Sequence, residues 1–292
     1  MSKIIFALPQ NNALAITLAD KLKVEIGLAD IRNFPDGETY IRIDSDVKDK
    51  IIILVFHLDH PNNHFLSLIF LTAELKKLGA KKICLVAPYL PYMRQDTQFK
   101  PGEAVTAILF AKLLSSYIDE LITIDPHLHR IKNLSEIYSV PTILLHATKP
   151  IAEWIKNNVK NPLIIGPDEE STQWVEAVAR YADAPYVIVK KIRHGDRKVS
   201  VTLPEINDTQ KTPVLVDDII STGMSMCAVI KQLLDKQFKN PICIGVHALF
   251  NKDDYQNLMQ AGAQTIISCD TISHPSNEID ISDLLIEGIK KC

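Results

Sequence analysis

Short apolar runs alternate with segments of helical periodicity along most of the chain. The apolar runs predict buried strands at residues 3–7, 51–56, 82–87, 121–125, 162–166, 186–190, 213–217, 241–247 and 264–268. Apolar residues spaced three or four positions apart predict helices at about 12–23, 65–78, 102–117, 149–158, 170–182, 223–238 and 253–261. Strands that alternate with helices favour mainly parallel sheets flanked by helices. The pattern therefore predicts an α/β protein.

One arrangement of elements occurs twice. Residues 51–87 and residues 213–247 share the order strand, loop, helix and strand. The second loop carries two aspartates and Ser-Thr-Gly where the first carries residues 57–63. This order is common in α/β proteins, so the echo alone is weak evidence of duplication. Its simplest interpretation is two related domains, one with an altered loop.

No low-complexity linker separates the two halves, and we place the boundary near residues 141–148. This predicts an N-terminal domain of residues 1–145 and a C-terminal domain of residues 146–271. The closing segment, residues 272–292, contains a helical pattern at 278–291. It is a candidate to return to the first domain.

The composition is that of a globular protein. Its 292 residues are 47% apolar, which suffices for a full core in one large or two medium domains. The net charge of −3 gives no general attraction to nucleic acid or an anionic membrane, so any anion site has to be local. No apolar run approaches the roughly 20 residues of a membrane span, and residues 1–9 stop too soon for a signal peptide. Five cysteines without a CxxC pair favour reduced packing residues and a cytoplasmic protein.

The densest candidate chemistry follows the strand predicted at 213–217. Asp217 and Asp218 end this run, and a turn of small residues then opens the helical pattern. The turn comprises Ser221, Thr222, Gly223, Met224 and Ser225. A loop of this kind turns backbone N–H groups and the positive helix end toward an anion, which predicts a phosphate cradle rather than a Walker loop. The two acids would repel phosphate, so we expect them to bind sugar hydroxyls or a hydrated cation. The same residues can also serve only as a helix cap.

Two segments of the first half carry chemistry suited to a nucleotide. Phe34 lies in a turn with Asp36 and Glu38, where it can stack on a purine while an acid accepts from the exocyclic amine. A plain surface turn is the alternative. Arg94 and Gln95 follow a predicted strand and can donate to phosphate oxygens.

Acids and histidines follow other strands. Asp96 comes next in the chain, and it can hold the arginine or a ribose hydroxyl, or form an ordinary surface ion pair. His127 and His129 follow the strand at 121–125, but they lack the further ligands that zinc requires. Mg²⁺, which needs few protein ligands, fits better. A hydrogen-bonded loop histidine is the alternative, and it is the preferred interpretation of His129.

These segments together resemble the ribose-phosphate pyrophosphokinases, or phosphoribosyl pyrophosphate synthases, over essentially the full length. The paired aspartates and Ser-Thr-Gly are similar to the loop that these enzymes share with phosphoribosyltransferases. Arg94-Gln95-Asp96 and the spaced pair Lys191 and Arg193 are more specific to the pyrophosphokinases. The short chain and the sequence Ile-Ile-Ser-Thr-Gly at residues 219–223 resemble the archaeal-type branch of the family.

The resemblance implies two phosphoribosyltransferase-like domains, the first on the ATP side and the second on the ribose 5-phosphate side. It implies Mg²⁺ near His127 and Asp168, with Asp168 also facing the sugar phosphate. It also implies a homodimer or higher homo-oligomer in which the Phe34 turn reaches a neighbouring subunit. Lys191 and Arg193 then form a mobile catalytic arm. Without the resemblance, the Lys/Arg run is a solvated hairpin tip and Asp168 a charge at a helix start.

The implied reaction moves pyrophosphate from Mg-ATP to the anomeric hydroxyl of ribose 5-phosphate, giving phosphoribosyl pyrophosphate and AMP. Four residues depart from the family pattern: Glu170, Ser171, Ser221 and Met224. Met224 stands at a usual glycine position and needs an allowed backbone conformation. These departures leave a non-catalytic phosphoribosyl pyrophosphate-binding regulator as an alternative. A phosphoribosyltransferase is a weaker one, since it would leave Phe34 and Arg94 unexplained. Neither nucleic acid nor membrane is expected as a partner.

Overall fold

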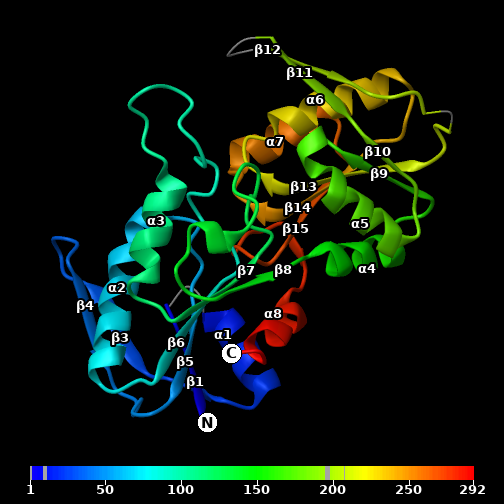
Figure 1. The fold of residues 1–292 in the computed structure, drawn as a ribbon. Helices are drawn as coiled ribbons and strands as arrows, with labels where there is room; N and C mark the ends of the chain where they lie inside the picture. The colour runs from blue at the N-terminus through cyan, green and yellow to red at the C-terminus, as the bar shows by residue number, and fades with distance from the viewer. Residues whose placement is uncertain (1, 9–11, 195–197, 207) are drawn as a thin grey trace. The chain divides into compact units, whose positions relative to one another are not determined.

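The structure is a computed structural model, and it describes residues 2–8, 12–194, 198–206 and 208–292. The chain divides into two compact units. The first contains Met1–Leu145 together with Ser282–Cys292, and the second contains His146–Ile281. Figure 1 follows the chain through both.

The first unit is built on a six-stranded parallel sheet in the order β2-β1-β5-β6-β7-β8. The strands are β1 (Lys3–Ala7), β2 (Glu25–Ile26), β5 (Ile51–Val55), β6 (Lys82–Ala87), β7 (Glu120–Ile124) and β8 (Thr142–Leu145). Every residue of β5 and β7 is buried. Continuous burial explains the unbroken apolar run of β5, whereas β7 is apolar except for Glu120 and Thr123.

Helices cover both faces of this sheet (Figure 1). They are α1 (Asn12–Leu22), α2 (Pro61–Lys77), α3 (Thr106–Ser115) and α8 (Ser282–Ile289), with a short 3₁₀ helix η2 (Leu134–Glu136). Leu68, Leu71 and Leu75 repeat at helical spacing on α2 and pack in the core with Phe110 of α3. On the other face α8 packs beside α1, where Lys21 binds Asp283 at 2.9 Å.

An antiparallel hairpin outside the main sheet carries the Phe34 turn. Its strands are β3 (Ala29–Asn33) and β4 (Thr39–Ile43). Ile31, Ile41 and Ile43 pack against the core, so the hairpin is held by α2 rather than by the sheet. Strand β4 contains the alternating pattern of residues 40–43, whereas β3 has no clear pattern of its own in the sequence.

The second unit repeats the architecture, with strand order β10-β9-β13-β14-β15-β16, again all parallel. The strands are β9 (Pro162–Gly166), β10 (Tyr186–Ile188), β13 (Thr212–Ile220), β14 (Ile242–Ala248), β15 (Thr265–Cys269) and β16 (Asn277–Ile279). The helices are α4 (Thr148–Asn158), α5 (Thr172–Ala182), α6 (Met224–Asp235) and α7 (Lys252–Ala261), with the 3₁₀ helix η3 (Glu169–Ser171). A second hairpin joins β11 (Lys190–His194) and β12 (Lys198–Thr202).

The two sheets share one topology. In each, the second strand lies outside the first, the third to sixth follow on its other side, and a hairpin is inserted between the second and third. The echo between residues 51–87 and 213–247 is confirmed, because β5–α2–β6 and β13–α6–β14 occupy equal places. The α/β class with two related parallel sheets is confirmed as well.

Several element limits differ from the prediction. Helix α2 begins at Pro61, because proline is favoured in the first helical turn, and so takes residues that were expected in the loop 57–63. Helix α8 spans only Ser282–Ile289 of the predicted 278–291. Short edge strands such as β2, β8 and β16 were missed, since two to four residues carry little periodicity. None of the helices in the described parts of the chain is long and apolar enough to span a bilayer.

Candidate functional site

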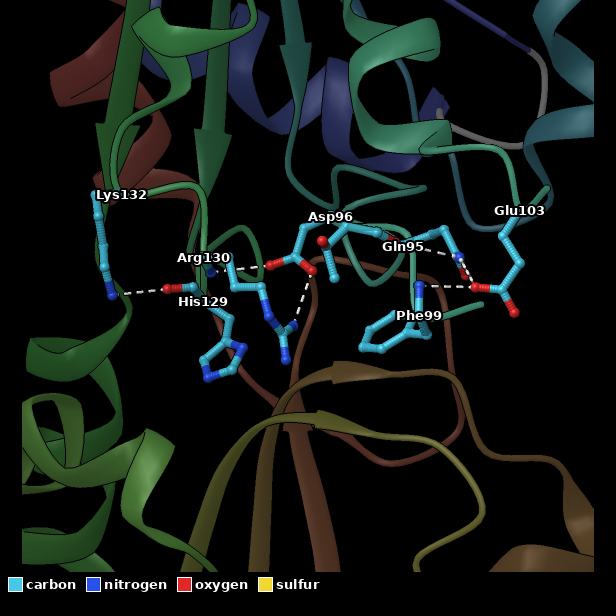
Figure 2. Close-up of polar contacts among 8 residues, drawn as sticks. Gln95, Asp96, Phe99, Glu103, His129, Arg130 and Lys132 are labelled. Atoms are coloured by element: carbon cyan, nitrogen blue, oxygen red, sulfur yellow. Dashed lines mark hydrogen bonds and ion pairs between the residues drawn. The ribbon is translucent and has the colours of Figure 1, made fainter. Parts of the chain in front are cut away.

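The loops after β6 and β7 form one connected polar structure in the first unit (Figure 2). The two strands are neighbours in the sheet, so their carboxyl ends lie side by side. The Asp96 carboxylate accepts from the Arg130 guanidinium at 3.0 Å and from the Arg130 backbone N–H at 2.9 Å. The Asp96 side chain is 2% exposed and that of Arg130 is 47% exposed. Arg130 thus binds the buried Asp96 carboxylate while about half of its own side chain remains exposed to solvent.

The electrostatics of this anchor favour the charged carboxylate. Burial acts to raise the pKa of Asp96, but the two hydrogen bonds and the positive charge of Arg130 outweigh it and lower that pKa. The guanidinium also lies 5.0 Å from the ring centre of Phe99. The predicted role of Asp96 in holding an arginine is therefore filled by Arg130, which sequence reasoning missed. The available signal was its position beside His129 at the end of a strand.

Arg94 and Gln95 lie in the same loop. Arg94 is exposed, as a phosphate-binding side chain requires. Gln95 points to Glu103, whose carboxylate also accepts from the backbone N–H groups of Phe99 at 2.9 Å and Lys100 at 3.0 Å (Figure 2). Glu103 therefore orders the segment that follows Arg94, another contribution not predicted.

The histidines follow β7 in a turn that starts at Asp125, whose φ of 35° is positive. The Asp125 backbone N–H donates to Leu145 at 3.0 Å, which fixes this turn to the end of β8. His127 and His129 are both half-buried. Lys132 donates to the carbonyl of His129 at 2.7 Å (Figure 2), consistent with a structural role for that stretch.

The Phe34 turn is well formed. The Phe34 backbone N–H donates to the Glu38 carbonyl at 2.8 Å. The Asp36 carboxylate accepts from the Glu38 N–H at 3.2 Å. The Phe34 ring is 43% exposed and meets Tyr40 edge-on at 6.0 Å. The Arg32 guanidinium lies over both rings, 4.3 Å from the ring centre of Tyr40 and 5.4 Å from that of Phe34. One face of the phenyl ring is thus supported while the side chain remains available for stacking.

In the second unit, Asp217 and Asp218 lie inside β13 rather than after it. The strand continues to Ile220, and Asp217 pairs with Gly245 of β14. Asp217 accepts from the N–H of Asp218 at 3.1 Å, and Asp218 accepts from the N–H of Ile219 at 2.8 Å. The register between β13 and β14 continues past Asp218 to Ile219 and Ile220, so both acids lie within the paired strand. The end of strand 213–217 was therefore predicted too early.

The turn after β13 has the expected helix-start geometry. Gly223 precedes α6 with φ 67°, a left-handed conformation that favours glycine. A Cβ at this position would meet Leu258 Cδ1 at 2.8 Å. Met224 is the first helical residue, is 73% exposed and is not among the residues with positive φ, so its presence imposes no backbone strain. Thr222 is exposed, while Ser221 and Ser225 are half-buried.

Asp168 lies at the end of β9, the direct neighbour of β13. This is the point where the strand order reverses, the usual ligand position in open α/β sheets. Burial, together with the negative charges of Asp218 and Asp168, raises the pKa of Asp217 well above its ordinary value. The three predicted carboxylates of this unit are therefore close enough to interact.

Ser171 replaces a family glycine without distorting the loop. Its hydroxyl donates to the carbonyl of Asp168 at 2.7 Å, and its backbone has a negative φ of −80°. Gly166 is needed instead, because a Cβ there would meet the Ser171 hydroxyl at 2.6 Å. The side chain of Glu170 lies outside the described residues.

Lys191 and Arg193 occupy alternate positions of β11, opposite Val201 and Val199 of β12. The hairpin expected for this cationic run is therefore present. Their side chains, and residues 195–197 between the two strands, lie outside the described part of the molecule. Neither His127 nor Asp168 belongs to a cluster of three ligand-type side chains among the described residues; Cys84, Glu120 and Cys292 form one.

Comparisons with known proteins agree with this geometry. Residues 3–117 match the family described as the N-terminal domain of ribose phosphate pyrophosphokinase, and residues 133–284 match the phosphoribosyl transferase domain. The ribose-phosphate pyrophosphokinase of Saccharolobus solfataricus is 31% identical over 278 residues, which is 94% of each chain. That of Methanobrevibacter smithii is 29% identical over 92% of this chain and 94% of the relative.

The crystal structure of phosphoribosylpyrophosphate synthetase from Mycobacterium smegmatis has the same fold. Its TM-score is 0.86 at 24% sequence identity, with 99% of this chain and 98% of that chain covered. The two matched domains, the near full-length relatives and the paired sheets lead to one conclusion. The chain belongs to the ribose-phosphate pyrophosphokinase family.

Proposed function

We propose that the protein transfers pyrophosphate from Mg-ATP to the anomeric hydroxyl of ribose 5-phosphate, giving phosphoribosyl pyrophosphate and AMP. The observation that carries the proposal is the anchored Arg94-Gln95-Asp96 loop. A phosphoribosyltransferase needs the cradle after β13 but has no use for this second phosphate-binding loop. Both occur in one chain of the family.

Ribose 5-phosphate binds to the second unit in this proposal. Residues 221–225 hold the 5-phosphate because they lead into the start of α6, where the positive end of the helix dipole favours an anion. Gly223 keeps the backbone open to close approach by the phosphate. Asp217 and Asp218 accept hydrogen bonds from ribose hydroxyls.

The carboxylates at this edge of the sheet suit Mg²⁺. Mutual repulsion among Asp168, Asp217 and Asp218 is what a bound cation would relieve, and carboxylate oxygens are the ligands that Mg²⁺ prefers. When bound with the nucleotide, the ion supplies charge neutralisation on the phosphate oxygens. We assign Asp168 to the coordination sphere of this ion, and His127 of the first unit remains a predicted Mg²⁺ ligand.

ATP binds to side chains of the first unit in this proposal. Phe34 stacks on adenine, and Asp36 or Glu38 accepts from its amino group. Arg94 and Gln95 donate to the triphosphate. Arg130 holds these residues in position through Asp96.

Lys191 and Arg193 supply positive charge to the transferring phosphoryl group. Phosphoryl transfer depends mainly on positioning and on charge stabilisation, so two cations on one strand of the β11–β12 hairpin suit this step. The anomeric oxygen forms a bond to the β-phosphorus while the bond from that phosphorus to the α,β-bridging oxygen breaks, AMP leaves with the bridging oxygen, and the hydroxyl proton passes to solvent. We assign no general base.

The Phe34 turn is proposed to complete the site of a neighbouring chain in a homodimer or higher oligomer. The turn precedes β4, whereas the other site residues follow strand ends, lie near the end of β13 or lie in the second hairpin. The cytoplasmic location expected from the sequence remains a prediction.

The test is direct measurement of products. Purified protein with ATP, ribose 5-phosphate and Mg²⁺ should form AMP and phosphoribosyl pyrophosphate in equal amounts. Release of AMP only in the presence of ribose 5-phosphate supports the proposal. Binding of phosphoribosyl pyrophosphate without turnover would favour the non-catalytic regulator. Turnover only with a nucleobase and phosphoribosyl pyrophosphate would favour a phosphoribosyltransferase.

A further inference from the structure

Two cysteines far apart in the sequence meet in the first unit. The sulfur atoms of Cys84 and Cys292 lie 2.6 Å apart, although 208 positions separate the residues along the chain. Cys84 is fully buried on the central strand β6, and Cys292 follows α8 and is half-buried. Both residues are free thiols here, and their sulfur atoms are in direct contact, which is the placement that a disulfide between them requires.

Two charged side chains complete the cluster. Glu120 of β7 is the direct cross-strand partner of Cys84, and Lys82 binds the Glu120 carboxylate at 2.8 Å. Burial acts to raise the pKa of Glu120, but hydrogen bonds from the Cys292 thiol and the Lys82 ammonium outweigh it and lower that pKa. The carboxylate thus stays charged, and one of its oxygens lies within 4.8 Å of both sulfur atoms.

The two thiols differ in accessibility. Hydrogen bonding to Cys292 and burial raise the pKa of Cys84, so that this thiol stays protonated and sheltered. Cys292 is the half-buried member and is the one that a small oxidant can reach. The arrangement matches an attacked cysteine with an adjacent resolving cysteine.

We propose that Cys84 and Cys292 are a redox modification site that closes to a disulfide with hydrogen peroxide as oxidant. In the first step, the Cys292 thiol is oxidised to sulfenic acid and peroxide is reduced to one molecule of water. In the second, the Cys84 sulfur attacks the Cys292 sulfur, a sulfur–sulfur bond forms, and the sulfenic oxygen leaves as water with the Cys84 proton. A dithiol reductant returns both residues to thiols.

The bond would tether α8 to the sheet of the first unit. At present Lys3 donates to the carbonyl of Ile289 at 2.8 Å, while Leu285 and Ile289 are buried. Ser282, at the start of α8, directly follows Ile281, the last residue of the second unit. A covalent link after α8 would therefore hold the returning segment on the first unit. It would also restrict the unfolded chain through a very long loop, so the melting temperature should rise on oxidation.

The experiment uses the full chain, reduced and then treated with hydrogen peroxide in slight molar excess. We expect intact mass to fall by two hydrogens, a reducible crosslink between the peptides containing Cys84 and Cys292, and a higher melting temperature that dithiothreitol reverses. Cys292→Ser should abolish the crosslink and the melting shift. The matched control is Cys227→Ser, which removes another half-buried thiol and should leave both unchanged.

Cys84→Ser is a second variant, but it alters a buried core position and can fail to fold. The proposal therefore rests on the Cys292 variant and on the crosslinked peptide. Addition of two or three oxygens to Cys292, a crosslink between chains, or two freely alkylated thiols after oxidation would overturn it. Stoichiometric Zn²⁺ binding that blocks crosslinking would also overturn it and make the cluster a metal site, for which Cys84, Cys292 and Glu120 would be ligands.

Discussion

The Asp96 carboxylate accepts hydrogen bonds of about 3 Å from both the guanidinium and the backbone N–H of Arg130. The two residues thereby link the loops that follow the neighbouring strands β6 and β7. Asp96 is almost fully buried, whereas the Arg130 side chain is half exposed. The pair therefore acts as a structural support on its buried side and presents positive charge on its open side. This division of roles can be tested separately from catalysis.

Arg130→Met should destabilise the protein by about 1–2 kcal/mol, because one charged hydrogen bond to a buried carboxylate is lost while the backbone N–H remains. It should also raise the KM for ATP more than the KM for ribose 5-phosphate, since the loop carrying Arg94 is loosened. Urea unfolding and steady-state kinetics check the two effects. In a double-mutant cycle with Asp96→Asn, purely additive effects on stability would contradict direct coupling.

Lys191→Ala should lower turnover by about 100-fold or more with little change in ATP affinity, because its charge is required chiefly in the transition state. The matched control is Lys190→Ala, which removes an exposed lysine from the adjacent position of β11. Turnover numbers and ATP binding by calorimetry provide the comparison. A near-normal kcat with only a raised KM would assign Lys191 to substrate binding or to the surface.

Gly223→Ala should destabilise the protein by about 1–3 kcal/mol and weaken ribose 5-phosphate binding, since the new Cβ meets a positive φ and Leu258 together. Gly37→Ala is a useful control because Gly37 also has positive φ, 93°, but its Cβ would have no atom within 4 Å. The difference between the variants isolates the steric clash. Equal losses in thermal unfolding would mean that backbone strain alone determines the effect at both sites.

The strong periodic elements could be predicted because their apolar residues are also the buried ones. Strands β5 and β7 are entirely buried; β5 is an unbroken apolar run, and β7 is apolar except for Glu120 and Thr123. Strand β3, Ala-Asp-Ile-Arg-Asn, was missed because it is stabilised by pairing with β4 and by packing of Ile31, and it lacks a clear alternation of its own. Tertiary contacts determine whether such short strands form, and the periodicity of the sequence carries little information about those contacts.

The site followed the same division. Residues that follow strands, such as Asp168 and Arg94, could be proposed as site residues because parallel strands bring their carboxyl ends to one edge of a sheet. Arg130 and Glu103 were missed because their roles depend on hydrogen bonds to other loop residues, and the sequence does not show which residues those are. The extent of β13 was missed because two carboxylates look like the end of a strand, whereas Asp217 and Asp218 satisfy themselves on the local backbone.

His57 predicts a fall in stability under mildly acidic conditions. Burial lowers its pKa, opposed in part by the charge of Asp59, and its Nε2 has no hydrogen-bond partner among the described residues. Below its ordinary pKa of about 6.5, the unfolded state takes up the proton before the folded state does. The contribution of neutral, buried His57 to stability is therefore fully present above that pH, and it is lost as the pH falls through the pKa of His57 in the folded state.

The readout is the slope of the unfolding free energy between about pH 8 and pH 5, not its level, because removing His57 also changes packing. His57→Gln should flatten this slope by up to about 1.4 kcal/mol per pH unit in the acidic part of the range. His60→Gln, which replaces an exposed neighbouring histidine, should not. Identical slopes in the His57 variant and the parent would remove this residue as the source of acid sensitivity.

Mixing two inactive variants tests whether neighbouring chains share a site. Phe34→Ala/Asp36→Ala removes the base contacts, and Lys191→Ala removes the catalytic charge. If the Phe34 turn of one chain serves the site of another, mixed oligomers contain sites with an intact turn and an intact lysine, so activity should return in part. Subunit exchange is followed independently with chains of different mass. Should exchange be complete while activity stays at the level of the separate variants, each chain must use its own Phe34 turn.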